Sequence, residues 1–250
     1  MADPLLSVEG VSRGFGGLMA VNGASLSASA RRITALIGPN GAGKTTLFSL
    51  ISGFLKPSAG RVIYDGTDVT GEPPYRLARR GVARTFQIVQ PFAGLSVRDN
   101  ILVGAHLRHR GRGAAQAAAE AVGQEVGLGH LLHRPANSLT VAGRKRLELA
   151  RALATEPKLL LLDEVLAGLN PSEINEIVPI IRGLSARGIA IVMIEHVMQA
   201  VMSLAEQVFV LAEGRVIAQG SPAQVAADAR VVEAYLGHGA AAKLGGVDVL

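Results

Sequence analysis

GPNGAGKTT, residues 38–46, is the stretch that decides the fold. It fits the pattern G-x-x-x-x-G-K-T without a mismatch, and it lies between a predicted strand at 32–37 and a predicted helix that starts near Lys44. Gly41 and Gly43 permit a tight turn whose backbone N–H groups surround phosphate. Lys44 adds a positive charge, and the Thr45 hydroxyl can ligate Mg²⁺. The stretch predicts a phosphate loop made of Gly38, Pro39, Asn40, Gly41, Ala42, Gly43, Lys44, Thr45 and Thr46.

A second motif, LLLLDE at 159–164, places two carboxylates at the end of an apolar strand. Four leucines are typical of a strand buried on both faces, and ligands of parallel sheets bind at the carboxyl ends of the strands. Such a carboxylate pair is often only a helix cap, but residues 170–173 already form a complete cap for the next helix. We therefore interpret Asp163 as a magnesium ligand, direct or through water, and Glu164 as the base that polarises an attacking water.

Strand and helix patterns alternate along the second half of the chain. Strands are predicted at 158–162, 189–194 and 207–211, with helices from 171 and near 197–204. This alternation favours a parallel sheet with helices on its faces. Short strands with turns precede residue 37, a strand pair surrounds Asp65-Gly66, and an alanine-rich helical lobe is predicted from about 97 to 137. Pro179 is expected to kink the helix from 171 or end it early.

Composition narrows the class of protein. The 250 residues are 49% hydrophobic and 18% charged, which is typical of a folded protein. Without cysteine there is no disulfide framework and no thiolate metal site, and a reducing cytosol suits the chain. The N-terminus does not resemble a signal peptide, and no apolar run is long enough for a membrane span. We expect a soluble, non-secreted protein.

The net charge of +5 is modest, and its densest cluster is RHRGRG at 108–113. We interpret this cluster as a solvated surface loop, with attraction to anionic lipid or nucleic acid as the alternatives. No aromatic residue is interleaved with it for base stacking, which argues against nucleic acid.

Two polar residues are ambiguous by themselves. His196 follows the apolar strand IAIVMIE, where a histidine is as often structural as functional. Gln87, in RTFQIVQPF, would alone be an ordinary loop amide.

The order of motifs resembles one family. The phosphate loop, Gln87, the turn at 139, LLLLDE, AGLNP at 167–171 and His196 resemble the nucleotide-binding subunit of an ATP-binding cassette transporter. The resemblance covers residues 5–236. More narrowly, FGGLMAVNGASL, PPYRLARRGVARTFQ, NILVGAH, LELARALA and VVEAYLG resemble the ATPase subunits of branched-chain amino acid importers.

The resemblance implies a fold and a domain plan. The fold is the α/β phosphate-loop NTPase cassette, with a mainly parallel core sheet, an N-terminal antiparallel β subdomain and an inserted helical subdomain at about 97–155. Residues 1–236 would form this single domain, and 237–250 a flexible tail.

It also implies roles. Phe15 would stack on adenine, with a core aromatic as the alternative. Gln87 would reach the metal and the attacking water while linking to a transmembrane subunit. His196 would contact the γ-phosphate, and Lys44, Asp163 and Glu164 keep the roles given above. Residues 167–170 would pass between two active sites.

The family's signature turn, usually L-S-G-G-Q, falls on Leu139, Thr140, Val141, Ala142 and Gly143. In that family the turn binds the γ-phosphate held by a second ATPase chain, and the resemblance implies the same role for these residues. Thr140 keeps a hydroxyl, whereas Ala142 would cost about 1–2 kcal/mol if its position needs a positive φ. Gly143 leaves a flexible residue one step later, so the tight turn is expected to have moved there. We interpret the turn as altered but usable; the rival interpretation is a degenerate signature and a weak opposite site.

The implied function is an ATP-driven clamp in an importer. Two cassettes, as a homodimer or a heterodimer, would sandwich ATP and Mg²⁺ and drive transmembrane permease subunits, with a solute-binding protein as an indirect partner and no nucleic acid. The chain would lie on the cytoplasmic face of the cell membrane, docked through the surface around Gln87, Phe86 and Phe92. Alternatives are a non-hydrolysing regulatory half, an importer of another small solute, a cassette that acts outside transport, and an unrelated phosphate-loop kinase or GTPase.

Overall fold

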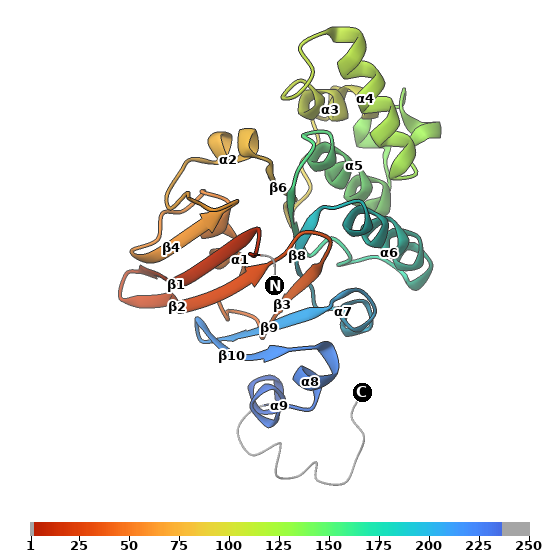
Figure 1. Cartoon of the computed structure of the whole chain (residues 1–250). Coiled ribbons are helices and arrows are strands. Elements are labelled where there is room, and N and C mark those ends of the chain that lie inside the picture. Colours follow the sequence, from red (N-terminus) through yellow and green to blue (C-terminus); the bar gives the residue numbers. More distant parts are fainter. Residues whose placement is uncertain (1–2, 237–250) are drawn as a thin grey trace.

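The computed structural model describes residues 3–236, and the tail predicted at 237–250 lies outside these residues (Figure 1). Within them, a six-stranded sheet has the order β10-β9-β3-β8-β7-β6. β10 alone is antiparallel to its neighbour, which confirms the mainly parallel core. The strands are β3 (Ile33–Ile37), β6 (Val82–Arg84), β7 (Leu159–Asp163), β8 (Ala190–Ile194), β9 (Gln207–Ala212) and β10 (Arg215–Gly220).

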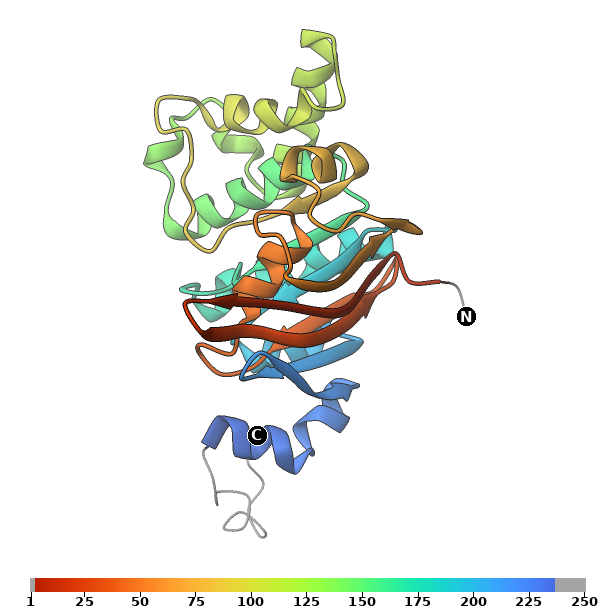
Figure 2. The same ribbon diagram turned by 90° about the vertical axis from the view of Figure 1, so that its left-hand side faces the viewer.

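The N-terminal strands form a separate antiparallel sheet, as expected, in the order β2-β1-β4-β5 (Figure 2). Its strands are β1 (Leu6–Phe15), β2 (Leu18–Ala28), β4 (Ala59–Tyr64) and β5 (Thr67–Asp68). The predicted turn between β4 and β5 has positive φ at both Asp65 and Gly66, 49° and 71°. This is the geometry that joins two strands through a two-residue hairpin.

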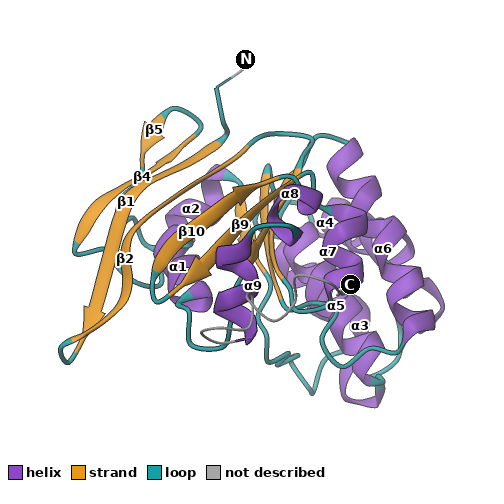
Figure 3. Ribbon diagram, turned by 90° about the horizontal axis from the view of Figure 1, so that it is seen from below, coloured by secondary structure: helices purple, strands orange, loops and turns teal. Residues whose placement is uncertain are grey.

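Helix α1 (Lys44–Ile51) lies between the two sheets (Figure 3). Leu47, Phe48 and Leu50 are buried in one hydrophobic cluster with side chains from both sheets. The opposite face of the core sheet is covered by α6 (Pro171–Ala186), α7 (Met198–Leu204) and the helical subdomain. Because α1 begins at Lys44, the phosphate loop leads directly into this helix.

The predicted helical lobe comprises α3 (Val97–Ala105), α4 (Arg112–Glu125), two short 3₁₀ turns and α5 (Val141–Leu153), coloured yellow to green in Figure 1. The basic cluster at 108–113, whose last two residues begin α4, is only partly solvated. Arg108 donates hydrogen bonds to the backbone oxygens of Ala78, Arg79 and Thr155. It thereby satisfies carbonyls near the ends of α2 (Pro74–Arg80) and α5, so the interpretation as a purely solvated loop is wrong for Arg108.

Helix α6 begins as predicted, since Asn170 and Glu173 form a capping box around Pro171. The expectation that Pro179 ends this helix early is wrong, because α6 continues to Ala186. Two helices that the sequence analysis left unassigned, α8 (Pro222–Ala226) and α9 (Ala229–Leu236), follow β10. Between residues 3 and 236, no helix combines the length and apolar character needed to cross a membrane.

Candidate active site

Strand register brings three loops to one edge of the core sheet. β8 lies between β3 and β7, with Ile194 paired to both Leu36 and Asp163. The backbone N–H of Glu164 donates to the oxygen of Ile194 over 3.0 Å. The phosphate loop after β3, Glu164 after β7 and His196 after β8 therefore emerge side by side at the carboxyl edge, where such sheets bind ligands.

Two glycines of the phosphate loop, Gly38 and Gly43, have no room for a side chain. A β-carbon on Gly38 would lie 1.9 Å from the backbone oxygen of Leu211, and one on Gly43 would lie 2.1 Å from that of Ala20. Lys44 Nζ donates to the backbone oxygens of Gly38 and Pro39 over 2.7 and 2.9 Å. Burial lowers the pKa of Lys44, and the nearby carboxylates of Glu164 and Asp163 partly oppose that shift. The loop thus holds the positively charged side chain of Lys44 at the centre of a close backbone turn.

A cavity of about 610 Å³ opens over this loop. Its volume is in the range of small-molecule sites. It is lined by Leu18, Met19, Ala20, Asn40, Gly41, Ala42, Gly43, Lys44, Thr45, Thr46, Glu164, His196, Glu213 and Gly214. Leu18 and Met19 are 72% and 43% exposed at this rim, so they offer an apolar surface to a ligand base. Neither residue could be recognised as part of the site from sequence, because large apolar side chains in a strand are ordinarily expected in the core.

Phe15 lies at the end of β1, cross-strand from Leu18. Its side chain is 45% exposed, so the alternative interpretation as a core aromatic is wrong. The Arg13 guanidinium lies 5.2 Å from its ring centre. Phe15 is not among the described residues that line the cavity, and its stacking on adenine stays a prediction.

Glu164 stands between two of the predicted polar residues. Gln87 Nε2 donates to one of its carboxylate oxygens over 2.7 Å, and His196 Nε2 lies 3.1 Å from the other. The backbone of Glu164 has a φ of 50°, an uncommon value for a residue with a side chain. Lys145 on α5 holds that backbone by donating to the oxygen of Glu164 over 2.8 Å and to that of Gln87 over 3.3 Å. The helical subdomain therefore contacts the centre of the site.

Asp163 is engaged by a residue that the sequence analysis did not select. Arg84 Nη2 donates to its Oδ2 over 2.8 Å, and both side chains are nearly buried. Burial raises the pKa of Asp163, whereas the hydrogen bond and charge of Arg84 lower it. Only the register of β6 beside β7, which a three-residue strand does not reveal in the sequence, brings the two residues together.

The remaining carboxylate oxygen suits a metal. Oδ1 of Asp163 is buried and accepts no hydrogen bond from any residue in the described part of the chain. Mg²⁺ prefers few protein oxygens supplemented by water and substrate phosphates. The donor set fits this ion, with Asp163 and the Thr45 hydroxyl as the protein groups that could hold it.

The signature turn differs from the expectation. Helix α5 begins at Val141, and the Thr140 side chain caps it by accepting from the backbone N–H of Gly143 over 3.2 Å. Ala142 therefore carries no positive-φ penalty, and the prediction that the tight turn moved to Gly143 is wrong because Gly143 lies in the first helical turn. Residues 139–143 are not among the described residues that line the cavity.

Comparisons with known proteins agree with this geometry. The ABC transporter family model matches residues 21–167, and the branched-chain amino acid ATP-binding cassette transporter model matches 215–241. The chain is 38% identical to the high-affinity branched-chain amino acid transport ATP-binding protein BraF of Pseudomonas aeruginosa, over 95% of this chain and 100% of BraF. It is also 38% identical to the high-affinity branched-chain amino acid transport ATP-binding protein LivG of Escherichia coli K12, over 95% of this chain and 100% of LivG.

A solved structure has the same fold. A nucleotide-free ATP-binding cassette from an ABC transporter superposes with a TM-score of 0.87 at 32% identity, covering 94% of this chain and 100% of that one. The ADP conformation of MJ1267, a cassette of an ABC transporter, gives 0.86 at 32% identity over 95% of this chain and 100% of its own. The chain therefore belongs to the ABC transporter family, as an ATPase cassette of its branched-chain amino acid transport branch.

Proposed function

We propose that this cassette powers the uptake of branched-chain amino acids by binding and hydrolysing ATP at the phosphate loop. The observation that carries the proposal is that Glu164, beside the phosphate loop, contacts both Gln87 and His196 through its carboxylate. The amino-acid class rests on the relatives, BraF and LivG, that are similar over nearly the whole chain.

The residues divide the hydrolysis between them. Lys44, now hydrogen-bonded to its own loop, exchanges those carbonyls for the β- and γ-phosphates of ATP. Glu164 polarises the attacking water, and His196 contacts the γ-phosphate and holds the carboxylate in place. When bound, Mg²⁺ neutralises phosphate charge, with Thr45, Asp163 and Gln87 as the residues that would hold it. Phe15, with Leu18 and Met19, supports the adenine.

ATP closes two copies of the chain head to tail. Each phosphate loop faces the partner's signature turn, whose α5 N-terminus attracts the γ-phosphate. Thr140 supports this role because its side chain fixes the first turn of α5. Closure is favoured by ATP and reversed by hydrolysis, so nucleotide binding free energy biases the attached subunits.

The membrane subunit docks beside Arg84. A groove of about 270 Å³ lies between α2, β6, α3 and α5, and we call it the docking groove. The exposed aromatic side chains of Phe54 and Phe86 line this groove. Phe92, also exposed, packs against Arg151, another residue of the groove. Exposed aromatics of this kind typify protein interfaces. The chain accordingly works at the cytoplasmic face of the membrane, and a solute-binding protein selects the cargo.

The test is uptake by cells that lack this chain. Cells complemented with the natural sequence should recover uptake of labelled leucine, isoleucine and valine, and cells with Glu164→Gln should not. If cells that lack the chain still take up the three amino acids but fail to take up a different solute, the assigned cargo is contradicted. That result would favour an importer of the other solute.

A further inference from the structure

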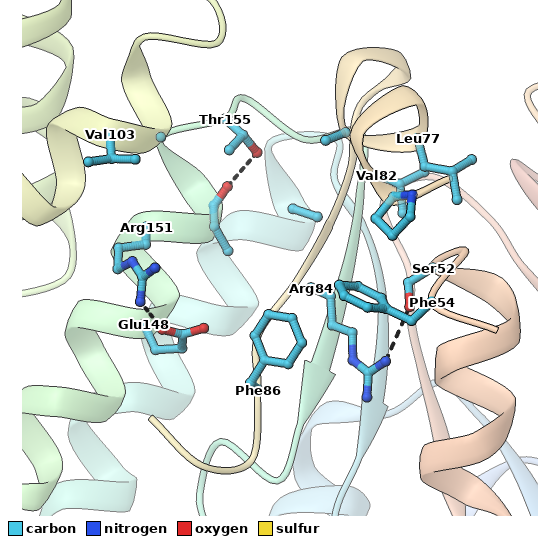
Figure 4. Close-up of a pocket in the computed structure, with 15 residues that line it drawn as sticks. Ser52, Phe54, Leu77, Val82, Arg84, Phe86, Val103, Glu148, Arg151 and Thr155 are labelled. Atoms are coloured by element: carbon cyan, nitrogen blue, oxygen red, sulfur yellow. Dashed lines mark hydrogen bonds and ion pairs between the residues drawn. The ribbon is translucent and has the colours of Figure 1, made fainter. Parts of the chain in front are cut away.

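Arg84 lines the docking groove beside Phe54 and Phe86 (Figure 4) and also contacts Asp163, the proposed metal ligand. On one side its guanidinium donates to Asp163 Oδ2, as described above. Its Nη1 donates to the hydroxyls of Ser49 and Ser52 on and just after α1 over 3.1 and 3.2 Å. Because the Arg84 side chain both lines the docking groove and contacts Asp163, a partner that docks in the groove can affect Asp163 through it.

Aromatic rings hold the guanidinium on the groove side. Its central carbon lies 5.4 Å from the ring centre of Phe86 and 5.8 Å from those of Phe54 and Phe48. Phe54 and Phe86 pack edge to face, with centres 5.5 Å apart. Both rings line the groove and are 51% and 42% exposed, so anything that docks there contacts them directly. Phe48, in contrast, is fully buried in α1 and cannot be touched from outside.

The contact with Arg84 engages one of the two oxygens of the Asp163 carboxylate. Arg84 donates to Oδ2, the Thr85 hydroxyl accepts from the Asp163 backbone N–H over 3.0 Å, and Oδ1 has no hydrogen-bond partner among residues 3–236. A buried carboxylate needs a compensating charge to stay ionised. Arg84 supplies that charge without occupying the oxygen that a metal would use.

We propose that Arg84 is a positioning residue that orients Asp163 for Mg²⁺ and, through Phe54 and Phe86, makes the strength of metal binding depend on the docking groove. The inference rests on the proposed function of that groove. A segment that presses on the two rings shifts the guanidinium, and the guanidinium shifts the carboxylate. Partners that orient metal ligands in this way commonly set metal affinity.

The experiment measures how much Mg²⁺ strengthens binding of the non-hydrolysable β,γ-imido analogue of ATP. Affinity is measured in EDTA and at rising Mg²⁺, and the ratio of the two affinities is the metal factor. For Arg84→Met we expect a metal factor reduced by about tenfold or more, the usual cost of losing such a partner. Affinity in EDTA should be preserved, since Lys44 and the loop are untouched, and this also shows that the variant is folded.

Groove variants test the second half of the proposal. Phe54→Leu and Phe86→Leu should each lower the metal factor by about two- to fivefold, the equivalent of one exposed cation–π contact. Added to Arg84→Met, neither should lower it further, because both act through Arg84. Tyr75→Leu is the matched control, since Tyr75 is also an exposed aromatic beside an arginine, Arg79 at 5.9 Å, but is not among the described groove residues. It should leave the metal factor unchanged.

Arg84→Lys guards against a variant that fails to fold. Lysine keeps the charge but cannot reach Asp163 and both serines together, so an intermediate metal factor is expected. An unchanged metal factor in Arg84→Met, or ring effects that persist without Arg84, would overturn the proposal. Absence of nucleotide binding by the natural sequence would instead contradict the proposed function, so the two failures are distinguishable.

Discussion

Gln87 and Glu164, 77 positions apart, are joined by a 2.7 Å hydrogen bond from the side-chain amide to the carboxylate. Gln87 lies in an exposed segment after β6, whereas Glu164 closes a buried strand. The bond therefore links the groove side of the molecule to the residue proposed to polarise water. Lys145 reinforces the link by holding both backbones from α5.

Replacing Gln87 with alanine should lower kcat more than it changes the KM for ATP. Glu164 would keep His196 but lose the amide that fixes its second oxygen, and small misplacement of catalytic groups costs up to about 100-fold. Steady-state hydrolysis by Gln87→Ala measures this. Gln90→Ala is the matched control, because Gln90 is an exposed neighbour whose side chain has no hydrogen bond to any described residue; its backbone oxygen accepts from Arg151. Equal effects in the two variants would contradict the role of Gln87.

Two glycines of the phosphate loop should respond differently to alanine. Gly43→Ala places a β-carbon 2.1 Å from a backbone oxygen, so the loop must move and stability should fall by several kcal/mol or the chain should fail to fold. At Gly41, with φ 79°, no described atom lies within 4 Å of that carbon. Only the left-handed backbone penalty of about 1–2 kcal/mol remains. Urea unfolding compares them, and equal losses would contradict the close packing of Gly43.

Glu195 should make stability depend on pH. Its carboxyl is 1% exposed, accepts from the backbone N–H of Leu166 over 2.9 Å, and has its pKa raised to about 7, chiefly by burial. The backbone N–H groups of Leu166 and His196 and the charge of Lys145 oppose this shift, and Glu164 adds to it. Because the folded state then binds the proton more tightly than the unfolded chain, stability is lost as pH rises from about 4.5 to about 7.

Glu195→Gln cannot ionise and should lose less stability over that window. Between pH 4.5 and 8, the free energy of unfolding of this variant should rise relative to that of the natural sequence by up to about 3 kcal/mol. Urea unfolding at several pH values measures the difference. Glu206→Gln, at an exposed carboxyl paired with Arg32, serves as the control. Parallel curves for Glu195→Gln and the natural sequence would show that Glu195 stays neutral, or stays ionised, throughout.

The sequence predicted the parts of the fold that local patterns encode. GPNGAGKTT, the four leucines of β7 and the cap of α6 each specify their structure within a few residues, and each is where it was expected. What it could not predict depends on tertiary neighbours. Arg84 acquires its partner from strand register, and Glu195 its unusual chemistry from burial. The signature turn was misjudged because Thr140 caps α5 and places Ala142 and Gly143 in its first turn, where no positive φ is needed.

The central claim is that ATP closes two copies of this cassette, and light scattering after size-exclusion chromatography tests it most directly. Glu164→Gln is used so that bound ATP persists, with Mg-ATP in one run and Mg-ADP in the other. The prediction is a dimer with ATP and a monomer with ADP, since only the γ-phosphate reaches the partner's α5. A monomer in both, with ATP binding verified on the same sample, would contradict closure of this chain on its own copy.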